Sequence, residues 1–126
     1  MIYGIGTDIV EIKRIAQMLN KHGAIFIQRI FTATEIEQAE HRKDSAQFYA
    51  GRWAAKEALS KALGSGIGEQ CSWQDIAIIN LSTGAPELKL TEKVLLLAGL
   101  KSTDSIHLSI SHEQHYACAT VIIEKN

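Results

Sequence analysis

The sequence predicts an α+β fold in which a leading strand and a helical first half pack on an antiparallel sheet. Three observations carry this prediction. Residues from Ile2 to Val10 alternate as a strand does. Residues 11–63 are rich in helix formers, and residues 75–124 contain short β-branched runs separated by turn residues. We expect one domain spanning residues 1–126, a length that allows a modest core.

The leading strand has two very different faces. Tyr3, Ile5, Thr7 and Ile9 form one face, and Gly4, Gly6 and Asp8 form the other. Glycines remove side chains where another element must come close. The alanine-lined face of a later helix is the candidate for that close neighbour. The two glycines are not a dinucleotide fingerprint, because no third glycine follows at the required place.

Three helical segments are expected between the leading strand and the central helix. The first runs from Glu11 to about Lys21 and ends at Gly23, and residues 24–31 add a turn or two. A capping box from Thr32 to Glu35 then starts a helix that ends near His41. The first segment carries more positive than negative charge and could steer an acidic partner.

The central helix is expected from Ser45 to Leu63, with Asp44 as its N-cap and glycines after its end. One of its stripes combines small alanines with Glu57 and Lys61, one turn apart. Two interpretations remain open. The pair could be a solvated i,i+4 salt bridge, which contributes only a few tenths of a kcal/mol. Alternatively, the alanines could let another charged element approach Glu57.

The second half reads as strands with one helix. We expect strands over 75–81 and 87–90, a helix from Thr91 to Gly99, and strands over 105–111 and 116–124. The glycine-rich loop 64–68 follows a helix and so lacks the N-terminal dipole of a P-loop. It could wrap phosphates with backbone amides or serve as a flexible turn.

The composition excludes several classes of protein. The net charge of −1 gives no overall basic field for nucleic acid. Two cysteines are too few for a disulfide framework, so a reduced, cytoplasmic protein is expected. We find no signal peptide and no apolar run near the ~20 residues that span a bilayer, so no membrane role is indicated.

Asp8 and Glu57 are the candidate metal ligands. Two carboxylates from separate elements, without sulfur or imidazole, suit Mg²⁺, which completes its shell with water and substrate phosphate. Lys61 and Arg52 would then neutralise phosphate oxygens. The clustered histidines do not match zinc spacing, and we interpret them as ordinary hydrogen-bonded residues. They are His107, His112 and His115.

Two segments in this order and at this distance make the sequence recognisable. Gly4–Ile12 (GIGTDIVEI) and Arg52–Ala62 (RWAAKEALSKA), followed by Gly64–Ile67 (GSGI), closely resemble bacterial holo-[acyl-carrier-protein] synthases, the short class of 4′-phosphopantetheinyl transferases. The resemblance covers essentially the whole chain. It implies the 4′-phosphopantetheinyl transferase fold. It also implies transfer of 4′-phosphopantetheine from coenzyme A to a serine of apo acyl carrier protein, releasing adenosine 3′,5′-bisphosphate, for fatty acid biosynthesis.

The resemblance also implies roles for individual residues. Asp8, Glu57 and Lys61 match the catalytic positions, and the first two match the Mg²⁺ ligands. Positions around coenzyme A are matched by Arg52, Lys61, Gly64, Gly66, Pro86 and His107. The carrier-protein docking helix is matched by Arg14, Met18 and Lys21. The family further implies a homotrimer with active sites at subunit interfaces.

Some questions remain open from the sequence. Many relatives have threonine where this chain has Glu113, so a nucleotide contact made by that threonine is in doubt here. The serine proton could go to Glu57, to a metal-held water or to another carboxylate. Two other functions would explain part of the pattern: a non-catalytic oligomeric module that binds an acidic partner, and a Mg²⁺-dependent nucleotide phosphohydrolase. The phosphohydrolase would not explain the basic first helix.

Overall fold

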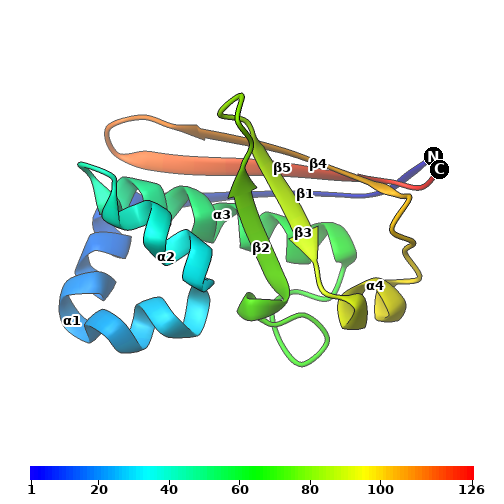
Figure 1. The fold of residues 1–126 in the computed structure, drawn as a ribbon, viewed down its shortest axis with the longest axis horizontal. Helices are drawn as coiled ribbons and strands as arrows, with labels where there is room; N and C mark the ends of the chain where they lie inside the picture. Colours follow the sequence, from blue (N-terminus) through cyan, green and yellow to red (C-terminus); the bar gives the residue numbers. More distant parts are fainter.

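The computed structural model describes residues 1–126 and confirms the α+β arrangement (Figure 1). The helices are α1 (Ile12–Ile30), α2 (Ala33–Glu40), α3 (Ser45–Leu63) and α4 (Glu92–Ala98), with a short 3-10 turn η1 (Trp73–Asp75). The strands are β1 (Ile2–Glu11), β2 (Ile76–Asn80), β3 (Pro86–Leu90), β4 (Ser105–His112) and β5 (Tyr116–Glu124). No helix is both long enough and apolar enough to cross a membrane.

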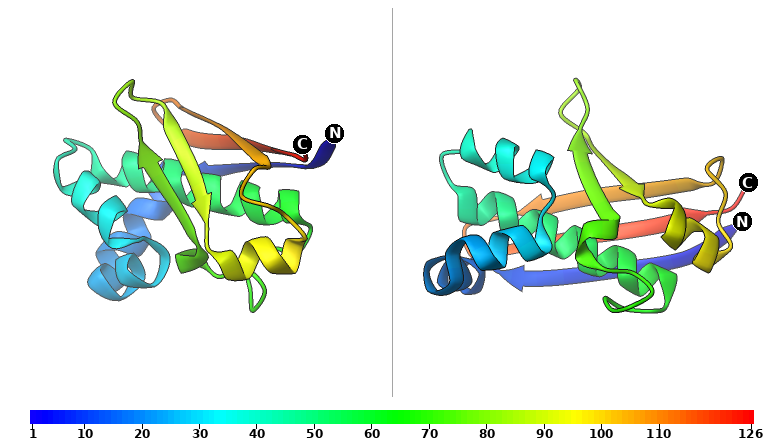
Figure 2. Two further views of the ribbon diagram at one scale, coloured as in Figure 1. Left: turned by 45° about the vertical axis from the view of Figure 1, so that its right-hand side comes forward. Right: turned by 60° about the horizontal axis from the view of Figure 1, so that its bottom comes forward.

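The strands form two antiparallel sheets instead of one. A three-stranded sheet has the order β1-β5-β4, and β2 and β3 form a separate hairpin (Figure 2). The leading strand is therefore an edge strand of the larger sheet and does not pack on top of it. Pairing with β5 satisfies one edge of its backbone, and its glycine face remains free for a helix.

The glycine face of β1 lies directly on α3, as expected. A Cβ atom at Gly6 would lie 1.8 Å from the carbonyl oxygen of Ala58, and one at Gly4 would lie 2.0 Å from that of Ala62. Gly4 and Gly6 are two strand residues apart, about 6.6 Å, and Ala58 and Ala62 are four helix residues apart, about 6.0 Å. Because these spacings are similar, each glycine lies against one of the two alanines. The next residue on this face of β1 is Asp8.

The central helix is buried on most of its circumference, which explains its alanine content. Ala50, Ala54, Ala55, Ala58 and Leu59 are all fully buried in the core. Small side chains let β1, β5 and α1 all pack closely on α3. Four charged residues nevertheless occur in this helix: Arg52, Lys56, Glu57 and Lys61.

The predicted helix ends are largely confirmed. Both hydrogen bonds of the Thr32–Glu35 capping box form, and the Asp44 side chain accepts from the Gln47 amide. The first two helical segments join as α1 with a break at Gly23, where φ is 52° and ψ is −127°. Thr91 stands at the N-cap of α4 but does not cap it, because its hydroxyl donates to Asp75 at 2.9 Å.

Candidate active site

Asp8, Glu57 and Lys61 meet where β1 crosses α3. The Lys61 Nζ atom lies 3.0 Å from the Asp8 carboxylate and 3.0 Å from the carbonyl oxygen of Thr7. The Asp8 side chain is only 16% exposed, whereas the Lys61 side chain is 51% exposed. The solvated salt bridge from Glu57 to Lys61 is absent, since Lys61 pairs with Asp8 instead. A second charged element does approach Glu57, and it is β1.

The Glu57 carboxylate is electrostatically frustrated. Burial raises its pKa above the ordinary value, the nearby Asp8 carboxylate raises it further, and Lys61 partly opposes this effect. No ion pair or hydrogen bond satisfies the Glu57 carboxylate. Two neighbouring carboxylates with only one ammonium beside them leave a net negative charge, which favours the binding of a cation.

This donor set fits a hard divalent cation. The two carboxylates come from different elements, and no group of three or more His, Cys, Asp or Glu side chains gathers anywhere in the chain. A site with few protein ligands suits Mg²⁺, which usually keeps several waters and binds substrate phosphate. Zinc would require more ligands of nitrogen or sulfur type.

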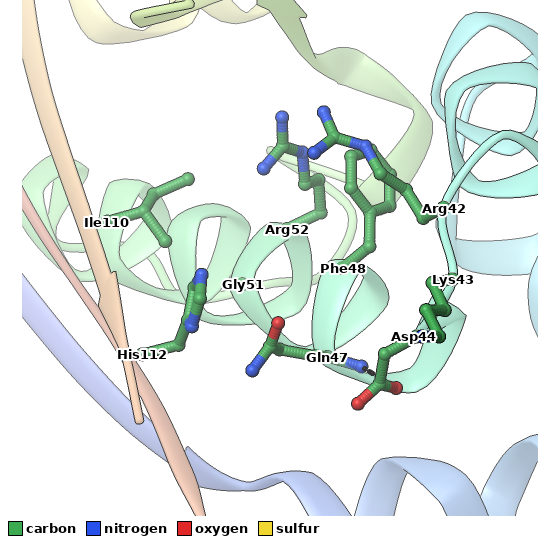
Figure 3. A pocket seen from close by; sticks show the side chains of 9 residues that line it. All are labelled: Arg42, Lys43, Asp44, Gln47, Phe48, Gly51, Arg52, Ile110 and His112. Carbon is green, nitrogen blue, oxygen red and sulfur yellow. Dashed lines mark hydrogen bonds between the residues drawn. The ribbon is translucent and has the colours of Figure 1, made fainter. Parts of the chain in front are cut away.

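A second, strongly basic pocket of about 270 Å³ surrounds Arg52 (Figure 3). The Arg52 guanidinium donates to Asn80 at 2.7 Å and lies 4.1 Å over the ring of Phe48, which Arg42 also contacts at 4.9 Å. Burial, followed by repulsion from Arg42, lowers the pKa of Arg52 to about 10. The buried Arg52 Nε atom has no hydrogen-bond partner. The pocket therefore favours an anion. Its lining residues are Arg42, Lys43, Asp44, Gln47, Phe48, Gly51, Arg52, Ile110 and His112.

The remaining residues expected near coenzyme A lie at several places. Pro86 pairs with Asn80 across the β2–β3 hairpin and so lies near Arg52. His107 lies outside the Arg52 pocket, exposed on β4, with its Nε2 3.1 Å from the Glu124 carboxylate. His112, which the sequence analysis assigned no coenzyme A contact, lines the pocket instead.

Gly64 and Gly66 end the central helix. Both have positive φ, and their amides donate to the carbonyl oxygens of Lys61 and Ser60. These two amides are therefore occupied within the chain. Any role of the glycines toward phosphate would come from close approach of the backbone or from neighbouring amides.

The charged residues of α3 that were expected in the site lie on two different sides of the helix. Arg52 and Glu57 are five residues apart, which corresponds to about 140° around the helix. Asp8, Glu57 and Lys61 form one group, and Arg52 with the basic pocket forms the other. One copy of the chain does not bring the two groups together.

The residues expected to dock the carrier protein share one face of α1. Arg14, Met18 and Lys21 follow helical spacing, and both charged side chains are exposed. Beside Met18 lies an apolar pocket of about 360 Å³ that the sequence analysis did not predict. It is lined by Met18, His22, Ile25, Phe26, Arg29, Ile30, Trp53 and Trp73.

Sequence reasoning also missed a buried ion pair. The Lys56 Nζ lies 2.8 Å from the Glu35 carboxylate, and both side chains are fully buried. Glu35 was expected only in the capping box, which it does form. A sequence signal for this pair did exist. Lys56 lies between Ala54, Ala55 and Ala58, and a lysine among small residues of a buried helix needs a buried partner.

Comparisons with known proteins identify the family and the fold. Residues 4–121 match the model of the 4′-phosphopantetheinyl transferase superfamily. A holo-[acyl-carrier-protein] synthase of Vibrio cholerae is 46% identical over 125 residues, covering 99% of each chain. The crystal structure of the Neisseria meningitidis synthase matches with a TM-score of 0.89 at 38% identity, covering 99% of this chain and 100% of that one.

A third comparison includes a ligand. The Helicobacter pylori holo-[acyl-carrier-protein] synthase, solved in complex with coenzyme A, matches with a TM-score of 0.86 at 33% identity. The match covers 95% of this chain and 99% of that one. Each of these three matches covers nearly the full length of both chains. The chain therefore belongs to the 4′-phosphopantetheinyl transferase superfamily, within its holo-[acyl-carrier-protein] synthase group.

Proposed function

We propose that this chain transfers 4′-phosphopantetheine from coenzyme A to a serine of apo acyl carrier protein. The observation that carries the proposal is the convergence of Asp8, Glu57 and Lys61 at one crossing of strand and helix in a chain of this family. A non-catalytic binding module would have no need to hold two carboxylates and an ammonium together. Fatty acid synthesis in the cytoplasm is the setting we propose for this activity.

Asp8 and Glu57 would hold Mg²⁺, which would neutralise the charge of the coenzyme A pyrophosphate. Half of the Lys61 side chain is exposed, so a bound pyrophosphate could reach its ammonium. Its ammonium can then contact the pyrophosphate and protonate the leaving phosphate. The remaining acceleration comes from holding the serine oxygen in line with the phosphorus atom. Glu57 is one of several candidates to accept the serine proton.

The basic pocket supplies the second half of the coenzyme A site. Arg42, Lys43, Arg52 and His112 surround it, and Asp44 is its one acidic lining residue. Phosphate groups of the adenosine half would relieve the repulsion between Arg42 and Arg52. This pocket therefore suits the phosphorylated nucleotide, and the Asp8 site suits the pyrophosphate.

The carrier protein would dock on α1. Acyl carrier proteins of this type are acidic, and Arg14 and Lys21 present positive charge beside Met18. The apolar pocket that includes Trp53 and Trp73 lies beside Met18 and can receive an apolar side chain of the carrier. Charge would then guide the encounter, and the pocket would fix the orientation.

We propose that three copies of the chain assemble so that one copy's basic pocket faces another copy's Asp8 site. Ile5 and Ile9 are 65% and 66% exposed on the outer face of the three-stranded sheet, which no element of this chain covers. A mixing experiment tests the arrangement. Asp8→Asn and Arg52→Ala variants, each inactive alone, should regain activity after dissociation and joint reassembly. No regain would argue against shared sites.

The mass of an apo acyl carrier protein after incubation with the enzyme and coenzyme A tests the activity. A gain of one phosphopantetheine group that requires Mg²⁺ and is blocked by a chelator is expected. Asp8→Asn and Glu57→Gln should give no gain while keeping the circular dichroism of the wild type. No gain with the wild type and several carriers would refute the proposed function.

A further inference from the structure

A buried lysine joins four segments of the chain beneath the apolar pocket. The Lys56 Nζ donates to the carbonyl oxygen of Ile30 at 2.7 Å and to that of Trp73 at 3.1 Å, besides its ion pair with Glu35. All three donor positions of the ammonium are therefore satisfied. One side chain ties α3 to the end of α1, to α2 and to η1.

The partner carboxylate is satisfied equally well. Glu35 accepts from the amide of Thr32 at 2.9 Å and from the amide of Ile78 at 2.7 Å, in addition to Lys56. A buried charge pair is retained only with such complete hydrogen bonding, because its desolvation is costly. Through Glu35 the pair adds the strand β2 to the segments that are held together.

Two of the groups that Lys56 holds are walls of the apolar pocket. Ile30 and Trp73 both line it, and Lys56 binds their carbonyl oxygens from behind. The Trp73 ring lies 4.7 Å from that of Trp53, which stacks in turn on Phe26 at 6.0 Å. Without Lys56, the main tie between η1 and α1 would be the Gln74 side chain, which donates to the carbonyl oxygens of Gln28 and Phe31.

We propose that Lys56 and Glu35 are positioning residues for carrier-protein docking, because their buried ion pair fixes the walls of the pocket that receives the carrier. This inference rests on the proposed function. It assigns a role in binding the carrier to residues that touch neither the carrier nor coenzyme A. Loss of the pair should therefore affect one substrate and spare the other.

Steady-state kinetics of Lys56→Met with both substrates tests this. The KM for apo acyl carrier protein should rise roughly tenfold, while the KM for coenzyme A stays within about twofold. The two tryptophans of the chain both line the pocket, so the intrinsic fluorescence should also shift to longer wavelength. Glu35→Gln keeps the shape of the side chain and should show the same split in a milder form.

Val94→Ala is the matched control, since Val94 is 2% exposed in α4 and does not line this pocket. It should lower the melting temperature without changing the KM for the carrier. The inference is overturned if folded Lys56→Met keeps the wild-type carrier KM and fluorescence, or if both KM values rise together. Failure of the wild type to modify any carrier would instead refute the proposed function.

Discussion

Gly6→Ala is the sharpest test of how the site is built. The new Cβ would lie 1.8 Å from the carbonyl oxygen of Ala58, 2.7 Å from the amide nitrogen of Ala62 and 2.9 Å from the carbonyl carbon of Ala58. All three are backbone atoms of a packed helix, so no rotamer change can relieve the clash. Raising the closest contact from 1.8 Å to at least 3.0 Å requires β1 and α3 to separate by 1.2 Å.

Moving β1 away from α3 by this distance would also disturb its pairing with β5. β1 is hydrogen-bonded to β5, where Gly6 pairs with Val121, a fully buried residue. Overpacking typically costs about 1–3 kcal/mol, and a backbone clash between two packed elements belongs at or above the upper end. For a chain of this length, ~3 kcal/mol corresponds to a decrease of roughly 10 °C in melting temperature.

Thermal unfolding of Gly6→Ala and Gly51→Ala, followed by circular dichroism, measures the effect. At Gly51 the one atom near a new Cβ is the Cγ2 methyl of Ile110 at 3.1 Å, which needs to shift by only a few tenths of an ångström. Alanine also gains up to ~1 kcal/mol of helix propensity. That variant should keep or raise the melting temperature. Because Asp8 follows Gly6 by two residues, Gly6→Ala should also lose Mg²⁺-dependent transfer. An unchanged melting temperature in Gly6→Ala would refute the close-packing argument.

Three further predictions concern charge and backbone. Burial raises the folded pKa of Glu57, so its ionisation opposes folding above its ordinary pKa of 4.5, and Glu57→Gln should melt higher at neutral pH. Mg²⁺ should then raise the melting temperature of the wild type only. Burial alone would raise the pKa of Asp75, but several hydrogen bonds together outweigh it and lower the pKa from 3.8 to about 2. The stability that Asp75 contributes is therefore complete above pH 3.8 and is lost as the pH falls toward 2. In Asp75→Asn, the loss of stability between pH 3.8 and 2 should be smaller than in the wild type, as measured by acid unfolding. Gly23→Ala should cost roughly 1–3 kcal/mol, because φ of 52° with ψ of −127° suits only glycine. Urea unfolding measures this change in the free energy of unfolding. An unchanged free energy would mean that α1 is straight at position 23 and does not need the positive φ.

Local chemistry made much of the fold predictable from the sequence. The capping residues Thr32 and Asp44 and the terminating Gly64 act within one turn of the helix they limit, so the boundaries of α2 and α3 could be predicted. The glycine face of β1 predicted a close neighbour for the same reason. The division of the strands into two sheets depends on which strands meet in space, and periodicity carries no such information.

The site was predictable only in part. Asp8, Glu57 and Lys61 could be identified because the spacing and the family resemblance agree on them. The Glu35–Lys56 pair and the pocket around Trp73 could not, since their partners lie 21 and 20 residues apart in sequence and no local pattern joins them. His112 falls in the alternation with Ile106, Leu108 and Ile110, on the face opposite His107, so the pattern did contain a signal for it. The family resemblance pointed to His107 instead.

The charges of α3 show where a cation is needed. Three of its four charged side chains find partners on other elements: Arg52 on β2, Lys56 on α2 and Lys61 on β1. Glu57 finds none, and burial beside Asp8 raises its pKa. A helix packed this tightly retains an unpaired carboxylate at a cost in stability, and a resident cation shared with Asp8 would offset that cost. The same carboxylate that destabilises the isolated chain is therefore the group through which Mg²⁺ would stabilise it.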